Sequence, residues 1–420
     1  MNQFKSLLVI SYAFPPIKSM GSVRNYFLVK EVGRLFENKP LVFSTSNSKV
    51  LPKDHLNLDE FELSLLATLD YRSISNNTSS AGVSETGNSF KQFLRKLKST
   101  LPFSLFLGLG GPLFLFAGIW KGSIYLRKNK TAVILSLSEP FIDHIIASVL
   151  KKLFPKTTWI ADIQNLALEP DIEKVFWKGF QHLVYRKVLR SASVISTVSE
   201  GLVPHLKKYN NTVEVVELGI SSMYPKKAQV PNEKFTITYC GSLYPQQKLD
   251  VLLKVIIELV EAGQLTREEV QFQYAGTNQN IWNKHLEEYD LKTLSNDLGS
   301  VSYSKSRDIQ AASDLNLLLT WNTPNFKTII PGKYYDYLSV RKPILMIING
   351  DIDFDWEHRF QYLQPGFMCY NSGSEGLKEY VSNQIKLWRT KADNSLVINQ
   401  DLLEQHLIKN QVSKLTPYLS

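Results

Sequence analysis

The chain has 420 residues, of which 44% are apolar and 21% are charged, a composition typical of a globular protein with a substantial core. Its two cysteines, Cys240 and Cys369, lie in apolar runs without metal-ligand spacing, which argues against a disulfide framework and favours a reducing compartment. The net charge of +9 is modest for this length and gives no reason to expect nucleic acid as a partner. No apolar run near Met1 is long enough for an export signal, so we expect a cytoplasmic protein.

Short apolar runs alternate with amphipathic segments through the first half of the chain. Residues 22–36 are typical of a helix, because Leu28, Val32 and Leu35 share one face. The expected strands are Leu7–Ser11, Ala132–Leu137, Thr158–Ile163, Ser193–Val198 and Val213–Leu218, and the helices between the later strands are Ile142–Leu153, Asp171–Leu189 and Glu200–Tyr209. Strands and helices in this order predict a parallel sheet with right-handed crossovers.

The alternation stops at residues 221–234, which contain two prolines and few large apolar residues and are therefore predicted to be a linker. It then restarts with strands Phe235–Cys240, Val270–Tyr274, Leu315–Thr320 and Pro343–Ile348 and with helices Leu249–Ala262 and Gly332–Val340. The chain is thus expected to form two Rossmann-like α/β domains, residues 1–220 and 235–395, whose parallel sheets face a central cleft. Residues 396–420 would be a tail that could pack back on the first domain.

Two segments of the first domain do not follow the alternation. Asn47–Ser89 is polar and rich in serine and asparagine, and we expect a long excursion there. Between Glu85 and Glu139 the chain has no acidic residue, and two basic clusters flank the uncharged run Leu101–Trp120. The Gly-Gly-Pro centre of that run predicts two apolar arms and a turn. Basic flanks beside apolar bulk favour peripheral docking of residues 90–130 on an anionic membrane surface; a buried helical hairpin is the alternative.

Ligands of parallel α/β sheets bind beyond the carboxyl ends of the strands, so the loops at those ends carry the candidate site. The first loop, Tyr12–Arg24, enters a helix with Gly21, whose backbone can approach an anion, and Arg24, which adds charge in the first turn. The alternative there is an ordinary connection with Ser22 as a helix cap.

Two further loops have the same character in the second domain. Gly241–Lys248 follows a strand, and Ile330–Leu338 opens a helix with Pro331, Gly332 and Lys333. A diphosphate is bound by backbone donors, a helix N-terminus and mobile positive charge, which these loops supply together. The alternative is that both lysines are solvated surface charges.

At this point the sequence resembles glycosyltransferase family 4, which has the GT-B fold. The ordered segments that carry the resemblance are Tyr12–Arg24, Trp159–Asp162, Thr197–Leu202, Thr238–Leu243 and Pro331–Leu338. The strongest single match is Ile330–Leu345, IPGKYYDYLSVRKPIL, and the resemblance extends from about residue 7 to residue 350.

The resemblance implies retaining transfer of a hexosyl or related unit from a nucleoside-diphosphate sugar, without a cofactor or an obligatory metal ion. The catalytic positions would be Lys248, Lys333 and Asp162. The donor would be held by Gly241, Ser242, Gly332, Asp336 and Trp321, with Asp336 on the nucleotide ribose. The loop facing the diphosphate and acceptor would comprise Gly21, Ser22 and Arg24. The expected acceptor is lipid-linked or an oligosaccharide, in surface polysaccharide biosynthesis.

The chain also departs from the family pattern. Ser242 stands where the family usually has an arginine, and Thr328 stands where it often has a glutamate, eight positions before Asp336. Two other functions therefore stay open: a nucleotide-sugar epimerase of the same fold, and a catalytically inactive nucleotide-sugar-binding subunit of a membrane-bound assembly. An epimerase needs acid and base side chains in its cleft, and no convincing set is evident.

Overall fold

The computed structural model describes residues 6–17, 20–46, 56–69, 89–130, 132–166, 175–225, 231–323, 327, 330–373 and 375–419. These residues form two compact α/β units. Unit 1 contains the described residues up to Leu218 together with Ile408–Leu419, and unit 2 extends from Gly219 to Leu407.

Unit 1 is built on a seven-stranded parallel sheet with the order β3-β2-β1-β4-β5-β6-β7. Its strands are β1 (Leu7–Ile10), β2 (Leu41–Thr45), β3 (Glu62–Leu66), β4 (Val133–Leu137), β5 (Thr158–Ile163), β6 (Val194–Thr197) and β7 (Val213–Val215). Its helices are α1 (Met20–Gly33), α3 (Ser89–Ser99), α4 (Ser104–Leu107), α5 (Gly111–Lys128), α6 (Ile142–Leu153), α7 (Lys178–Leu189), α8 (Val203–Leu206) and α16 (Ile408–Ser413), with 3-10 turns at Glu200–Leu202 and Thr416–Tyr418.

Unit 2 is built on a six-stranded parallel sheet with the order β10-β9-β8-β11-β12-β13. Its strands are β8 (Phe235–Cys240), β9 (Val270–Ala275), β10 (Ser295–Asp297), β11 (Leu315–Trp321), β12 (Ile344–Asn349) and β13 (Gly366–Tyr370). Its helices are α9 (Asp250–Glu261), α10 (Gln279–Glu287), α11 (Tyr303–Ala312), α12 (Gly332–Val340), α13 (Phe354–Leu363), α14 (Leu377–Arg389) and α15 (Gln400–Gln405), with 3-10 turns at Arg267–Glu269 and Lys292–Leu294. Two sheets in which every described strand pair is parallel confirm the predicted pair of Rossmann-like domains.

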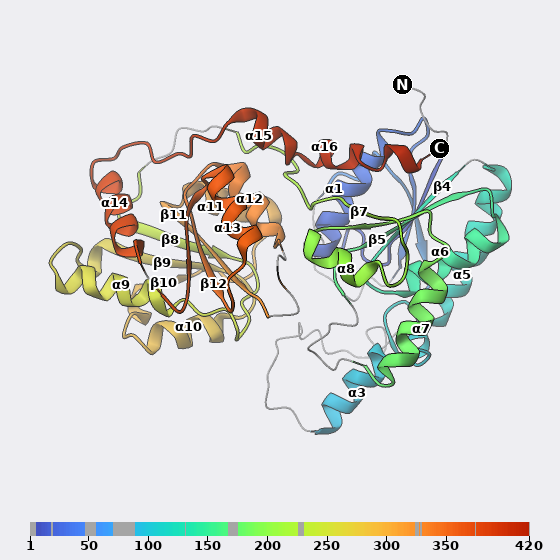
Figure 1. The fold of residues 1–420 in the computed structure, drawn as a ribbon, viewed down its shortest axis with the longest axis horizontal. Coiled ribbons are helices and arrows are strands. Elements are labelled where there is room, and N and C mark those ends of the chain that lie inside the picture. Colours follow the sequence, from blue (N-terminus) through green and yellow to red (C-terminus); the bar gives the residue numbers. More distant parts are fainter. Residues whose placement is uncertain are drawn as a thin grey trace. The chain divides into compact units, whose positions relative to one another are not determined.

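Helices cover both faces of each sheet, as buried parallel strands require. In unit 1 the face covered by α1 and α16 contains Val29, Val32, Ile408 and Val412 in one apolar cluster. Helices α5 and α6 pack closely together elsewhere in unit 1. Gly122 of α5 permits this approach, since a Cβ atom at its position would lie only 2.6 Å from Cδ1 of Leu150. In unit 2 one cluster joins the strands to α9, α10 and α14, and α11–α13 lie on the opposite side of the sheet (Figure 1).

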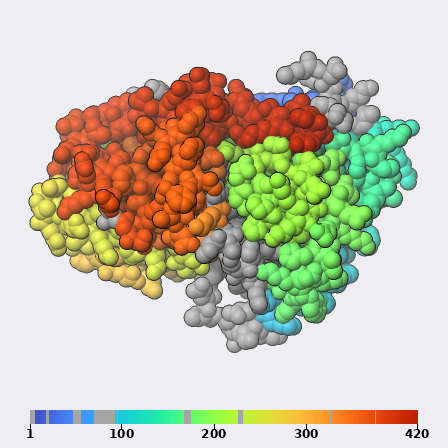
Figure 2. Space-filling view, in the orientation of Figure 1, coloured from blue at the N-terminus to red at the C-terminus, as the bar shows by residue number. Residues whose placement is uncertain are grey.

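The end of the chain belongs to unit 1. Helix α16 lies beside α1 (Figure 1), and the residues after it bond to β7: Lys414 Nζ donates to the carbonyl of Val215 over 3.0 Å. In the space-filling view this terminal segment, in dark red, lies against the green residues of unit 1 (Figure 2).

The expectation of an excursion over Asn47–Ser89 was partly wrong. Residues 62–66 within it form β3, which pairs in parallel with β2 from Glu62 opposite Leu41 to Leu66 opposite Thr45. This is an edge strand, half-exposed, and its alternation is too weak to be recognised in the sequence. Residues 47–55 and 70–88 lie outside the described part of the chain.

Helix limits differed from prediction where the chain contains proline or glycine. The helix expected over Glu200–Tyr209 is a 3-10 turn followed by α8, whose second residue is Pro204. The turn expected in Leu101–Trp120 is present between α4 and α5, but the second arm is much longer than expected, since α5 continues to Lys128. Among the described helices, none is both long and apolar enough to cross a membrane.

Candidate active site

The carboxyl edge of the unit 2 sheet brings together two of the predicted loops. Strand β8 ends at Cys240, and Gly241 follows with φ +120°, a conformation that L side chains rarely adopt. A Cβ atom on Gly241 would lie 3.1 Å from Nζ of Lys333, which comes from the first turn of α12. The structure therefore places Gly241 and Lys333 side by side although 92 positions separate them in the sequence.

Helix α12 is fixed to the sheet by a tyrosine. The hydroxyl of Tyr337 accepts a hydrogen bond from the backbone N–H of Cys240 and donates one to the carbonyl of Leu317, both over 3.2 Å. These bonds connect α12 to β8 and β11 at once. The position of Lys333, one turn earlier on the same helix, is thereby set by the sheet.

Lys333 has an unusual environment for a lysine. Its Nζ donates to the hydroxyl of Tyr239 over 2.5 Å and lies 3.9 Å from the centroid of the same ring. Burial lowers the pKa of Lys333 to about 7. The amine is therefore poised to change charge near neutral pH, and an anion beside it would favour the ammonium form.

The loop after β8 is held by a residue that sequence reasoning missed. Gln247 is buried; its Nε2 donates to the carbonyl of Leu319 over 2.6 Å, and its Oε1 accepts from the backbone N–H of Tyr244 over 3.0 Å. Tyr239 adds a bond from its hydroxyl to the carbonyl of Ser242 over 2.9 Å. A glutamine inside a loop carries no sequence signal of this role, because its partners are backbone groups of a distant strand.

The other predicted donor residues are spread around this loop. Lys248 is exposed, and no described hydrogen bond or ion pair connects it to Lys333. Ser242 is exposed, with its hydroxyl 3.4 Å from that of Thr277. Trp321, at the end of β11, packs against Tyr244 with ring centroids 5.4 Å apart. Gly332 is the first residue of α12.

Asp336 is engaged within unit 2. Its Oδ1 accepts a hydrogen bond from the hydroxyl of Tyr303 over 2.9 Å, and burial raises its pKa to about 6. The positive charges of Arg307 and Lys333 act against that rise. One carboxylate oxygen is thus committed to α11, which sequence reasoning did not anticipate. Thr328, the other position considered on this side, lies outside the described residues.

In unit 1 the structure joins two predicted residues as an ion pair. Arg24 of α1 contacts Asp162 at the end of β5, with Nη1 and Oδ2 2.8 Å apart. Asp162 is fully buried and also accepts hydrogen bonds from Ser196 over 2.9 Å and from Gln164 over 3.1 Å. Its oxygens are therefore occupied, and it positions Arg24 where the first loop ends in α1. Gly21 and Ser22 belong to the first turn of the same helix.

A cavity of about 630 Å³ opens within unit 1 beyond the ends of β4 and β5. Its wall is largely apolar and includes Leu101, Leu105 and Phe141. The lysines and histidines that line it are Lys98, Lys178, Lys208, His144, His182 and His205, and Glu139 supplies a carboxylate.

His144 is a fully buried polar residue in the wall of this cavity. Its Nδ1 lies 2.8 Å from Oγ of Ser136, which also accepts a hydrogen bond from the indole of Trp159 over 2.8 Å. Burial lowers the pKa of His144 to about 4, so the ring is neutral. We assign the Ser136 hydroxyl as the donor to Nδ1, because the described residues offer its proton no other acceptor. The ring proton then lies on Nε2, which is buried without a partner among the described residues. The feature of the sequence that could have indicated this contact is Ser136, a single polar residue in an otherwise apolar strand.

Comparisons with known proteins identify the fold of this chain but no family or sequence relative. No protein-family model matches the chain, and no curated protein matches it. Among solved structures, sucrose-phosphate synthase from Thermosynechococcus elongatus superposes with a TM-score of 0.58 at 10% identity, over 99% of this chain and 95% of that one. The α,α-trehalose-phosphate synthase from Burkholderia xenovorans gives 0.57 at 12% identity, over 98% and 99%. The lipopolysaccharide outer core galactosyltransferase WaaB gives 0.52 at 13% identity, over 99% of both chains.

The chain has a GT-B fold. The prediction of this architecture from alternating strands and helices is confirmed by the two parallel sheets and by these three likenesses. In this GT-B chain the Gly241–Lys333 pair lies on the unit 2 sheet, and the Arg24–Asp162 pair lies on the unit 1 sheet.

Proposed function

We propose that this protein is a cytoplasmic, retaining glycosyltransferase similar to family 4, which moves a sugar from a nucleoside-diphosphate sugar to a lipid-linked acceptor in surface polysaccharide biosynthesis. The observation that carries the proposal is the meeting of Gly241 and Lys333 at the carboxyl edge of the unit 2 sheet. A diphosphate needs a backbone that it can approach closely, a helix N-terminus and a positive charge. Gly241, the start of α12 and Lys333, which gains charge beside an anion, supply these parts.

The proposed reaction breaks the bond between C1 of the sugar and the diphosphate oxygen. The acceptor oxygen bonds to C1 on the same face, and its proton passes to the leaving diphosphate. Negative charge therefore grows on the diphosphate in the transition state, and Lys333 stabilises it there. One such donor contributes on the order of 100- to 1,000-fold in turnover.

Support for an amphiphilic acceptor comes from the cavity of unit 1. Its apolar wall suits a hydrocarbon chain, and three lysines at its edge suit an acidic headgroup such as a lipid phosphate or diphosphate.

Support for membrane docking comes from the outer surface of α5. Leu113, Phe116 and Trp120 are spaced so that they lie on one face, and the last two are 66% and 67% exposed. Arg127 and Lys128 end the helix and are exposed. An apolar stripe beside basic residues is typical of helices that lie in the interface of an anionic membrane.

Activity is tested with purified protein and a panel of nucleoside-diphosphate sugars, by measuring donor hydrolysis and transfer to extracted lipid acceptors. We expect one donor to be turned over, and Lys333→Ala to lower kcat by about 100-fold or more. Lys386→Ala, which changes an exposed lysine on α14, is the matched control and should behave as wild type. Equal turnover by both variants would exclude Lys333 from the site.

Docking is tested by flotation with liposomes that contain anionic lipid. Wild type should float at low salt, and the double variant Phe116→Ser, Trp120→Ser should stay at the bottom. Phe354→Ser is the control, because this side chain is 74% exposed but lies on unit 2. Flotation of the double variant at wild-type level would contradict the assignment of α5.

A nucleotide-sugar-binding subunit without catalysis is the second candidate, and two observations favour it. Ser242 replaces the arginine that family 4 usually has, and Asp336 already bonds to Tyr303. Donor binding without hydrolysis or transfer, across the whole panel, would identify this function instead.

A further inference from the structure

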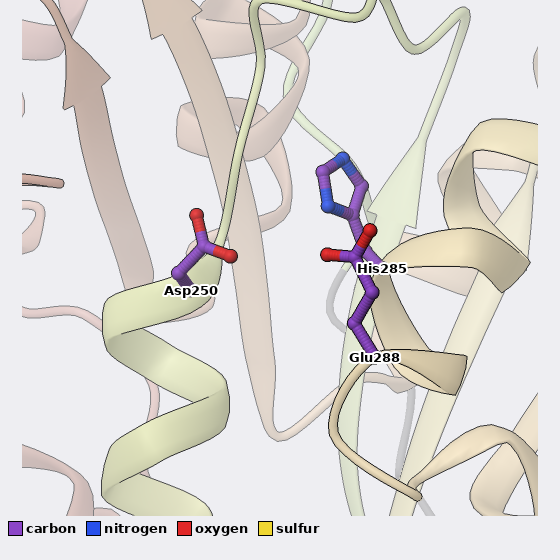
Figure 3. A group of neighbouring side chains, drawn as sticks. All are labelled: Asp250, His285 and Glu288. Atoms are coloured by element: carbon purple, nitrogen blue, oxygen red, sulfur yellow. The ribbon is translucent and has the colours of Figure 1, made fainter.

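Three potential metal ligands meet between α9 and α10, away from Lys333. Asp250 is the first residue of α9, His285 lies in α10, and Glu288 caps the end of α10. One ligand atom from each lies within 4.8 Å of the others. Figure 3 shows the two carboxylates and the imidazole turned toward a common point between the helices.

His285 points to a missing ligand. Both of its ring nitrogens are buried, and neither has a hydrogen-bond partner among the described residues. Buried imidazole nitrogens are almost always satisfied, since a donor or acceptor without a partner is unfavourable in the protein interior. A metal ion bound to one nitrogen would satisfy it, and imidazole is the commonest protein ligand of transition metals.

Asp250 is already held in position by its neighbours. Its Oδ1 accepts a hydrogen bond from the hydroxyl of Tyr289, and its Oδ2 accepts one from the amide of Asn371, each over 3.1 Å. Such outer contacts orient a coordinating carboxylate and are typical of metal sites. The remaining lone pairs of Asp250 stay available to a cation.

Glu288 supplies the adjustable ligand. In a tetrahedral zinc site with bonds of about 2.0–2.2 Å, ligand atoms lie roughly 3.4 Å apart, so the three groups must draw together slightly. Glu288 is exposed at the end of α10, where its side chain can move this distance. Water would complete the coordination.

We infer that Asp250, His285 and Glu288 bind a divalent transition-metal ion, with zinc as the best fit. One imidazole and two carboxylates suit a borderline cation, and the two negative charges balance it. The ion would connect the start of α9 to the end of α10. It would stabilise the segment that begins two residues after Lys248, and it takes no part in the transfer reaction. The site goes beyond the proposed function, and it leaves unchanged the expectation that the transfer reaction has no obligatory metal ion.

The test uses full-length, untagged protein that has been dialysed against a chelator and then titrated with Zn²⁺ by calorimetry. We expect one equivalent to bind and the Tm to rise. His285→Ala and Glu288→Gln should each weaken zinc binding by about tenfold or more, the scale of losing one ligand or its support. His358→Ala, which removes an exposed histidine on α13, is the control and should bind as wild type.

A second readout keeps the result clear if His285→Ala folds poorly. Co²⁺ bound by wild type should give the intense visible absorption of a tetrahedral site, and Glu288→Gln, an exposed change, should weaken it. Zinc binding of equal affinity in wild type, His285→Ala and Glu288→Gln would overturn the site, as would no binding by wild type. Nucleotide-sugar binding is measured on the same samples, so that failure of the metal site is distinguished from failure of the proposed donor site.

Discussion

Affinity for a nucleotide sugar should depend on pH through Lys333. We consider a rise from pH 6.5 to pH 8.5 and compare the Kd of wild type with that of the variant Lys333→Met at each pH. Burial lowers the pKa of Lys333 to about 7, so this range takes the free protein from mostly ammonium to mostly amine. The nucleotide sugar itself does not titrate there, because its diphosphate is esterified at both ends.

The magnitude follows from the fraction of ammonium. A group with a pKa of about 7 is roughly three-quarters protonated at pH 6.5 and about 3% protonated at pH 8.5. If only the ammonium form binds the diphosphate, Kd rises by about 25-fold over the range. Asp336, whose pKa burial raises to about 6, is already about three-quarters ionised at pH 6.5 and therefore changes charge much less than Lys333 over this range.

Calorimetry at constant ionic strength measures this slope directly. Wild type should lose affinity as the pH rises, while Lys333→Met should bind weakly at every pH, near the wild-type value at pH 8.5. Lys333→Arg should retain affinity at high pH, because guanidinium does not titrate. A Lys333→Met variant with the wild-type slope would assign the titration to another group and refute the reasoning.

The same pKa shift acts on stability with the opposite sign. The unfolded chain, with a lysine pKa near 10.5, binds more protons than the folded chain between about pH 7 and pH 10.5. The contribution of Lys333 to the free energy of unfolding therefore rises with pH through this window. A donor bound at Lys333 would reduce the effect by restoring the ammonium.

Three further predictions test other parts of the structure. Arg24→Ala leaves buried Asp162 without its cation and should lower the free energy of unfolding, measured by urea denaturation, by about 3 kcal/mol. The control Arg34→Ala breaks only an exposed pair with Glu31 and should lower it by less than about 1 kcal/mol. Equal effects of the two variants would contradict the buried ion pair. Gly241→Ala should weaken donor binding, measured by calorimetry, by about tenfold. Gly263 also has a positive φ but faces open space, so Gly263→Ala should leave donor binding unchanged. Similar losses of affinity in the two variants would show that backbone strain alone weakens donor binding. Dialysis against EDTA should preserve kcat while lowering the Tm, and complete loss of turnover restored by Mg²⁺ or Mn²⁺ would show that the reaction itself needs a metal.

Local periodicity was sufficient to predict much of the fold. Residues 142–153, 158–163, 235–240 and 332–340 form the predicted elements with the predicted limits, because each is a continuous apolar or amphipathic segment bounded by turn residues. Strand β3 was missed because an edge strand is buried on little of its surface. Its existence depends on pairing with β2, which is a tertiary effect.

The sequence predicted the loops at the carboxyl ends of the strands, but it did not predict which side chains form pairs there. Proximity of Gly241 and Lys333 follows from the rule that the carboxyl ends of parallel strands share one edge. No such rule pairs Arg24 with Asp162 or Tyr303 with Asp336, because these contacts depend on side-chain directions across the finished fold. The assignments of Asp162, Lys248 and Asp336 to catalysis and donor binding stay predictions.

The return of the chain end to unit 1 has a consequence for synthesis. Val412 and Leu415 belong to the same apolar cluster as Val29 and Val32, yet the ribosome makes them after all of unit 2. Unit 1 therefore keeps part of its apolar surface uncovered until residues 408–419 have been made. A stop codon shortly before residue 408 would leave unit 2 whole and damage the half of the molecule that was made first.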